Sequence, residues 1–118
     1  MMKTRPVVIA SLLLAGSLLL PASALAGKRP NPNRGKSQFK ATCKICHVKG
    51  GEAPNLTPMT KTQAQWKRFF GNGKKIAACV ERSEKRTQIK LGEEELRNMS
   101  YYLIKHAADS DQPETCGQ

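Results

Sequence analysis

Residues 43–47 of the chain read Cys-Lys-Ile-Cys-His, and this segment carries the side chains best suited to chemistry. Two thiols two residues apart, followed at once by an imidazole, suit half of a zinc site, a redox-active dithiol or an anchor for covalently attached haem. A zinc site needs a second close pair of ligands, but the other candidates, Cys79, His106 and Cys116, are scattered. A redox dithiol needs a preceding strand and a position at a helix N-terminus, whereas this motif lies at the far end of a predicted helix and no strand precedes it.

Haem attachment uses every residue of the motif. The thiols of Cys43 and Cys46 would each add to one vinyl group, and the spacing of two residues places both sulfurs along one edge of the ring. His47 would then turn its imidazole onto the iron as the proximal ligand. The sequence therefore predicts one covalent haem c held by Cys43, Cys46 and His47.

The first 26 residues have the pattern of a secretory signal peptide. Lys3 and Arg5 precede an apolar run over residues 7–20, and Ala24-Leu25-Ala26 predicts cleavage before Gly27. The alternative is an uncleaved membrane anchor, but the run is shorter than the roughly 20 residues that a membrane-spanning helix needs. We expect no membrane span after cleavage. The predicted location is the periplasm, which agrees with haem attachment because c-type haem is attached outside the cytoplasm.

The composition of the remaining chain, 27–118, predicts one small, basic domain. Its only aromatic residues are three Phe, two Tyr and one Trp, so a porphyrin would supply much of the buried apolar surface. The formal net charge of +11 falls to about +9 once Lys3 and Arg5 are removed. Such an excess attracts acidic partners and raises their encounter rates, and nucleic acid is a poor candidate partner for an exported protein.

The hydrophobic pattern predicts an all-α domain with long loops. No stretch alternates as a strand does, and the chain has no internal repeat. Residues 27–34, with two prolines, are expected to form a flexible arm before a domain over 35–118. The expected helices cover 35–46, about 61–70 with Thr60 or Thr62 as the cap, a short segment 76–80 before a charged stretch, and 93–106.

The segment 35–47 reads G-x-x-x-F-x-x-x-C-x-x-C-H, and it resembles the first helix and haem motif of class I cytochromes c. Residues 53–56 (APNL) and 93–103 (EEELRNMSYYL) are similar to two further parts of that family, and the tail resembles small exported cytochromes of metal-reducing bacteria. The resemblance implies a helical bundle wrapped around one haem.

The same resemblance implies two contacts. Gly35 and Phe39 would cross the last helix near Met99 and Tyr102. The carbonyl oxygen of Pro54 would accept a hydrogen bond from Nδ1 of the proximal histidine, which fixes the ring and raises its basicity.

The distal haem ligand is where the chain departs from the family pattern. In class I cytochromes c this methionine comes from a loop before the last helix, and residues 70–92 contain no methionine. We predict Met59 as the ligand, with His106 as the second candidate. Met99 is the third, although core packing explains it better, and five-coordinate iron is the remaining alternative.

Cys79 and Cys116 are the cysteines outside the motif. Two free thiols are unusual in an oxidising compartment, so we expect a disulfide between them. In the chain-entropy model, a disulfide that closes a loop of this length stabilises the folded chain by about 3–4 kcal/mol. The alternatives are reduced thiols or a bridge between two molecules.

Two functions fit these features. The first is a periplasmic electron carrier, not an enzyme, whose lysines steer acidic redox partners to the haem edge. The second is a haem-based sensor or small-ligand-binding or peroxidase-like protein with an open distal site. No catalytic constellation of side chains is visible. The lysines expected around the haem edge are Lys36, Lys40, Lys44, Lys49 and Lys61.

Overall fold

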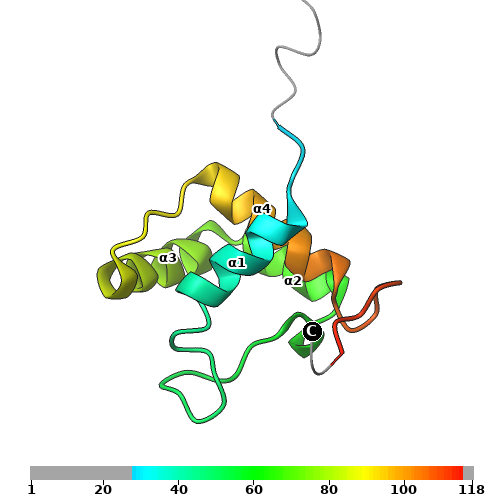
Figure 1. The fold of residues 1–118 in the computed structure, drawn as a ribbon, viewed down its shortest axis with the longest axis horizontal. Coiled ribbons are helices and arrows are strands. Elements are labelled where there is room, and N and C mark those ends of the chain that lie inside the picture. Colours follow the sequence, from blue (N-terminus) through cyan, green and yellow to red (C-terminus); the bar gives the residue numbers. More distant parts are fainter. Residues whose placement is uncertain (1–27, 116–118) are drawn as a thin grey trace, which may run out of the picture.

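Helices and long connections make up the described part of the chain, as predicted (Figure 1). The computed structural model describes residues 28–115; the predicted signal peptide and Cys116 lie outside this range. No strand occurs within 28–115. The elements are α1 (Pro32–Thr42), the 3-10 turn η2 (Pro58–Thr60), α2 (Gln63–Gly71), α3 (Gly73–Thr87) and α4 (Glu93–Lys105). No helix within this range is long and apolar enough to span a membrane.

The first helix begins earlier and ends earlier than predicted. The side chain of Asn31 accepts hydrogen bonds from the backbone N–H groups of Asn33 and Arg34, at 3.0 and 3.1 Å, and Pro32 occupies the first helical position. Both features favour a helix start. The last residues of the arm that was predicted over 27–34 are therefore helical from Pro32 on. Because α1 ends at Thr42, the motif lies in the turns that follow the helix.

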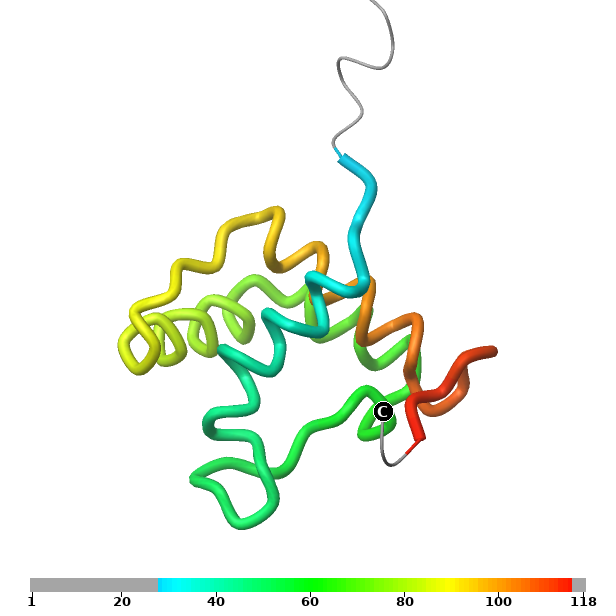
Figure 2. The backbone as a smooth tube through the Cα atoms, viewed as in Figure 1, coloured from blue at the N-terminus to red at the C-terminus, as the bar shows by residue number. Residues whose placement is uncertain are grey.

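The third helix was predicted too short. Asn72 alone separates α2 from α3, and its side chain accepts a hydrogen bond of 3.2 Å from Lys75 N, which caps α3. The charged stretch after Val80 is helical as far as Thr87, with a Lys85–Glu81 ion pair of 2.7 Å one turn apart. Such pairs stabilise an exposed helical face without apolar periodicity. Figure 2 shows the chain passing from α2 straight into α3.

The crossing of α1 and α4 is the main helix packing of the domain, as the resemblance implied (Figure 1). A Cβ atom on Gly35 would lie 2.1 Å from the carbonyl oxygen of Asn98 and 3.0 Å from the nitrogen of Met99. Only glycine therefore allows the two backbones to approach this closely. One turn further on, Phe39 packs against Tyr102 with ring centroids 6.1 Å apart.

Gly35→Ala should destabilise the fold strongly, because the added methyl group meets backbone atoms that cannot rotate away. We expect a loss of at least about 1–3 kcal/mol in the free energy of unfolding, measured by urea titration. Gly71→Ala is the matched control, since a Cβ there meets nothing within 4 Å. Equal stability of the two variants would contradict the close helix crossing.

The buried core between the helices is small. Trp66 is 1% exposed, and its indole N–H donates a hydrogen bond of 2.9 Å to the carbonyl oxygen of Pro58, which holds η2 against α2. The buried apolar side chains of the described residues are Phe39, Trp66, Leu91, Met99, Tyr102, Leu103 and Ala107.

Candidate functional site

The motif residues project from the turns that end α1. The N–H of Cys43 donates to the carbonyl oxygen of Phe39 at 2.9 Å, and the N–H of His47 donates to the carbonyl oxygen of Cys43 at 3.1 Å. These bonds continue a helix-like path for one more turn. As a result, Cys43, Cys46 and His47 line one common cavity of about 170 Å³.

The imidazole of His47 is held by the loop that returns towards η2. Its Nδ1 lies 2.8 Å from the carbonyl oxygen of Pro54, and the backbone N–H of Leu56 donates to the carbonyl oxygen of His47 at 3.1 Å. A carbonyl oxygen can only accept, so Nδ1 is the donor, and in the neutral imidazole Nε2 keeps its lone pair. This arrangement suits a metal ligand, and it confirms the contact that the resemblance implied.

Cys43 and His47 also face the interior between the helices, where they line a narrow, largely apolar cavity of about 50 Å³. We call it the apolar cavity. The other side chains that line it are Phe39, Leu56, Trp66, Phe69, Phe70, Ile76, Cys79, Val80, Ser83, Leu91, Leu96, Met99 and Leu103.

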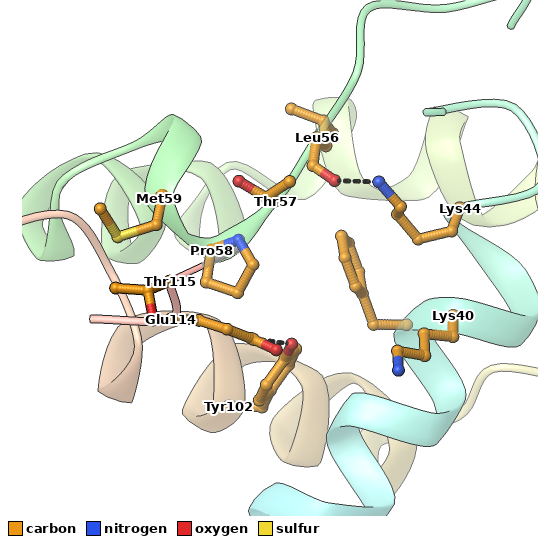
Figure 3. A pocket seen from close by; sticks show the side chains of 10 residues that line it. Lys40, Lys44, Leu56, Thr57, Pro58, Met59, Tyr102, Glu114 and Thr115 are labelled. Carbon is orange, nitrogen blue, oxygen red and sulfur yellow. Dashed lines mark hydrogen bonds between the residues drawn. The ribbon is translucent and has the colours of Figure 1, made fainter. Parts of the chain in front are cut away.

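A larger cavity of about 280 Å³ adjoins the apolar cavity, and the two share Phe39 and Leu56. We call it the tail cavity, because the C-terminal residues Glu114 and Thr115 close one side of it (Figure 3). The combined volume of the two cavities reaches the lower end of the range of roughly 300–1,000 Å³ that is usual for small-molecule sites.

Cys79 lies beside the motif, which its position in the sequence did not indicate. It lines both cavities that Cys43 lines, and the hydroxyl of Ser83, one turn later on α3, donates 3.0 Å to the carbonyl oxygen of Thr42. Burial raises the pKa of the Cys43 thiol, a contact with Thr42 opposes the rise, and the nearby thiol of Cys79 adds to it. Within residues 28–115 no disulfide is formed, and Cys116 lies outside the described residues.

The candidate distal ligands lie in different places. Met99 lines the apolar cavity together with His47, but its side chain is 2% exposed and its sulfur lies 3.8 Å from Oγ1 of Thr42. Met59 is 40% exposed on η2 and lines the tail cavity (Figure 3). His106 caps α4 and lines neither cavity, and its Nδ1 lies 2.7 Å from the carbonyl oxygen of Gln112.

A buried polar network ties the tail to α1 and α4, and sequence reasoning missed it. The hydroxyl of Tyr102 donates to the carboxylate of Glu114, which also pairs with Lys36 at 2.7 Å (Figure 3 shows the Tyr102–Glu114 contact). Burial and this hydrogen bond raise the pKa of Tyr102. Partial burial raises the pKa of Glu114, but the hydrogen bonds from Lys36 and Tyr102 outweigh it, so the pKa lies below its usual range. The tail follows the last predicted helix, and its polar side chains gave no periodic signal in the sequence.

The donor set and the lining fit a haem. Two thiols and an imidazole whose Nδ1 is held by Pro54 meet at the cavity beside the motif. Cys43 and His47 also line the apolar cavity, whose other walls are mainly aliphatic and aromatic, and such surroundings exclude water from an iron site. Cys43 and Cys46 would hold the porphyrin edge, and His47 would hold the iron. The haem, when bound, supplies one-electron redox chemistry.

The described fold is all-helical, a Cys-x-x-Cys-His turn follows its first helix, and that helix crosses the last one. These three features define a class I-like c-type cytochrome domain. A family model agrees: the one described as cytochrome c oxidase, cbb3-type, subunit III matches residues 30–103. The chain belongs to this cytochrome c family, whose domains are haem-based electron carriers. No curated protein and no solved structure matches the chain.

Proposed function

We propose that the protein is a periplasmic electron carrier with one covalent haem c, bound through Cys43 and Cys46 and ligated by His47. The observation that carries this proposal is the 2.8 Å contact between His47 Nδ1 and the carbonyl oxygen of Pro54 beside both motif thiols. That contact orients Nε2 for iron. The predicted signal peptide supports an exported protein.

The surface beside the motif suits docking of an acidic redox protein. Ile45 and Val48 are 44% and 37% exposed on either side of Cys46-His47, and the exposed side chains of Lys40 and Lys49 lie nearby in the sequence. An apolar centre with a cationic rim steers an acidic partner and then excludes water at contact. Lys36 is paired with Glu114, and Lys44 Nζ donates to Asn55 and to the Leu56 carbonyl, so these two lysines also have structural roles.

Haem content is tested directly on protein purified from the periplasmic fraction of cells that make c-type cytochromes. We expect one haem per chain by pyridine haemochrome assay, haem staining that survives a denaturing gel, and an intact mass equal to residues 27–118 plus one haem. Haem that is extracted by acidic acetone would contradict covalent attachment. A mass that includes residues 1–26 would contradict cleavage before Gly27.

One observation favours the alternative, a haem-based sensor or ligand-binding protein. Among the described residues, neither Met59 nor His106 lines the cavity that His47 lines, and Met99 is packed in the core. If the sixth iron position is open, the ferrous protein should bind carbon monoxide rapidly. Slow or absent binding would instead support a ligated carrier.

Met59 remains the proposed distal ligand, because it is exposed and free to reorient, whereas Met99 and His106 are both held by other groups. Met59→Ala should remove the far-red charge-transfer band of the ferric protein and lower the reduction potential, since a thioether favours ferrous iron. Met99→Ala should keep the band and lose about 2–5 kcal/mol of stability. A band that persists in Met59→Ala would refute this assignment, and high-spin conversion in His106→Ala would point to His106.

A disulfide between Cys79 and Cys116 also remains a prediction. If it forms, intact mass spectrometry after alkylation without reductant should show no added alkyl group, and reduction should allow two. The last described residue, Thr115, lines the tail cavity, whereas Cys79 lines the cavities beside the motif. Two alkyl groups without reductant would mean that the bridge is absent.

A further inference from the structure

A second basic surface is formed by residues at the corner where α2 turns into α3, and none of the motif residues lines it. Figure 2 shows the path of the chain at this corner. It surrounds a hollow of about 230 Å³, which we call the basic hollow. The hollow is lined by Lys61, Gln65, Arg68, Phe69, Asn72 and Lys75. Arg68 and Lys75 are exposed, and Phe69 forms the apolar part of the lining.

The charge around the basic hollow has one sign. Residues 53–80 contain five Lys and Arg and no Asp or Glu. None of the ion pairs among residues 28–115 uses a cation of this segment. The nearest acid that the contacts reveal is Asp109, whose carboxylate accepts a hydrogen bond of 2.7 Å from the N–H of Gln63 at the start of α2. The cations of the hollow therefore have no neutralising partner within the described chain.

Two lysines at this corner, of which only Lys75 lines the hollow, lie at the unfavourable end of α3. Lys74 and Lys75 lie in the first turn of α3, which has no acidic residue. Cations at the positive end of a helix dipole are unfavourable by about 0.3–1 kcal/mol each, and acids are preferred there. A local arrangement that opposes folding without a compensating contact is expected at functional surfaces.

Phe69 connects the basic hollow to the haem-binding interior. Its side chain lines the hollow and also lines the apolar cavity together with His47. It packs edge-on against Trp66 and Phe70, with ring centroids 6.1 and 5.3 Å away. At this corner a single aromatic side chain therefore separates the outer surface from the cavity that His47 lines.

We propose that the basic hollow is a second docking face, which receives the acidic surface of a redox protein. The proposal rests on the haem carrier function proposed above. The haem, when held by Cys43, Cys46 and His47, would exchange one electron with this partner, which would lose the electron that the haem gains or gain the electron that the haem loses. With the motif face, the carrier then has separate surfaces for its donor and its acceptor.

The test maps where anions bind to the ¹⁵N-labelled haem protein by NMR. Two probes are titrated at low salt: hexacyanochromate(III), a redox-inert paramagnetic anion, and a ten-residue oligoglutamate peptide that stands for an acidic protein surface. We expect both to perturb amides around Arg68 and Lys75, in addition to amides near the motif. Perturbation by hexacyanochromate but not by the peptide would overturn the proposal, because the hollow would then accept small anions only.

Charge reversal supplies the matched comparison. The double variant Arg68→Glu/Lys75→Glu should lose the perturbation at the hollow and weaken peptide binding there by about tenfold or more, in keeping with electrostatic attraction. Lys67→Glu/Lys74→Glu changes the net charge equally on the same two helices, but neither residue lines the hollow, so binding should be retained. Equal losses in both variants would overturn the proposal, because net charge alone would explain them.

Failure of this proposal is distinguishable from failure of the haem function. Covalent haem is established by the denaturing gel before the titration begins. Perturbed amides confined to residues 40–49 in a haem-loaded protein would exclude the second face and leave the carrier function intact.

Discussion

A variant in which Cys43 and Cys46 are both alanine should lose the covalent haem and most of its helical circular dichroism. The described residues bury only seven apolar side chains, and a domain of this size rarely folds stably on such a small core. The apolar cavity brings together aliphatic and aromatic side chains from α1 to α4 that need a common apolar partner. Removing the covalent link removes that partner from the folded state.

The control for this variant is Cys79→Ala, the same substitution at the third thiol beside the motif. It should retain haem and keep its helical signal. Normal helicity in haem-free Cys43→Ala/Cys46→Ala protein, purified from the same compartment, would show that the helices pack without haem.

Trp66→Ala should be the most destabilising substitution in α2, with an expected loss of about 3–5 kcal/mol, typical of emptied aromatic core sites. Trp66 is 1% exposed, and its indole N–H holds the Pro58 carbonyl oxygen at 2.9 Å. The variant therefore loses core packing and releases η2. Chemical denaturation of the haem-loaded protein, followed by circular dichroism, measures the loss.

Trp66→Phe separates the two contributions. It keeps a buried ring but removes the hydrogen bond, so we expect a loss nearer 1–2 kcal/mol from the unpaired carbonyl oxygen and the smaller ring. Similar losses for the two variants would mean that the contact with Pro58, and not packing, dominates at this position.

The sequence predicted the elements whose patterns are local and failed where the information is tertiary. The last helix was predicted within one residue, because Glu93–Glu95 mark its positive end and apolar residues recur at helical spacing. The third helix was too short in the prediction, because its second half is stabilised by charged pairs and by the Ser83 contact with Thr42, and neither gives apolar periodicity.

The site shows the same division. The motif spacing identified Cys43, Cys46 and His47, and the family resemblance identified Pro54. The position of Cys79 beside Cys43 depends on how α3 packs on the end of α1, and no local pattern encodes that packing. The pairing of Lys36 with Glu114 joins residues from opposite ends of the domain and was equally hidden.

The contact of α1 with α4 also determines the order in which the chain can fold. Synthesis delivers the N-terminal end first, so the Cys-x-x-Cys-His turn emerges well before residues 93–105. Until α4 has been synthesised, the surfaces of Gly35 and Phe39 that it covers have no packing partner. The long-range contact between α1 and α4 therefore forms late. The thiols of the unfinished chain are thus not yet covered by the packed helices, and this order of events would suit covalent attachment of a haem before folding is complete.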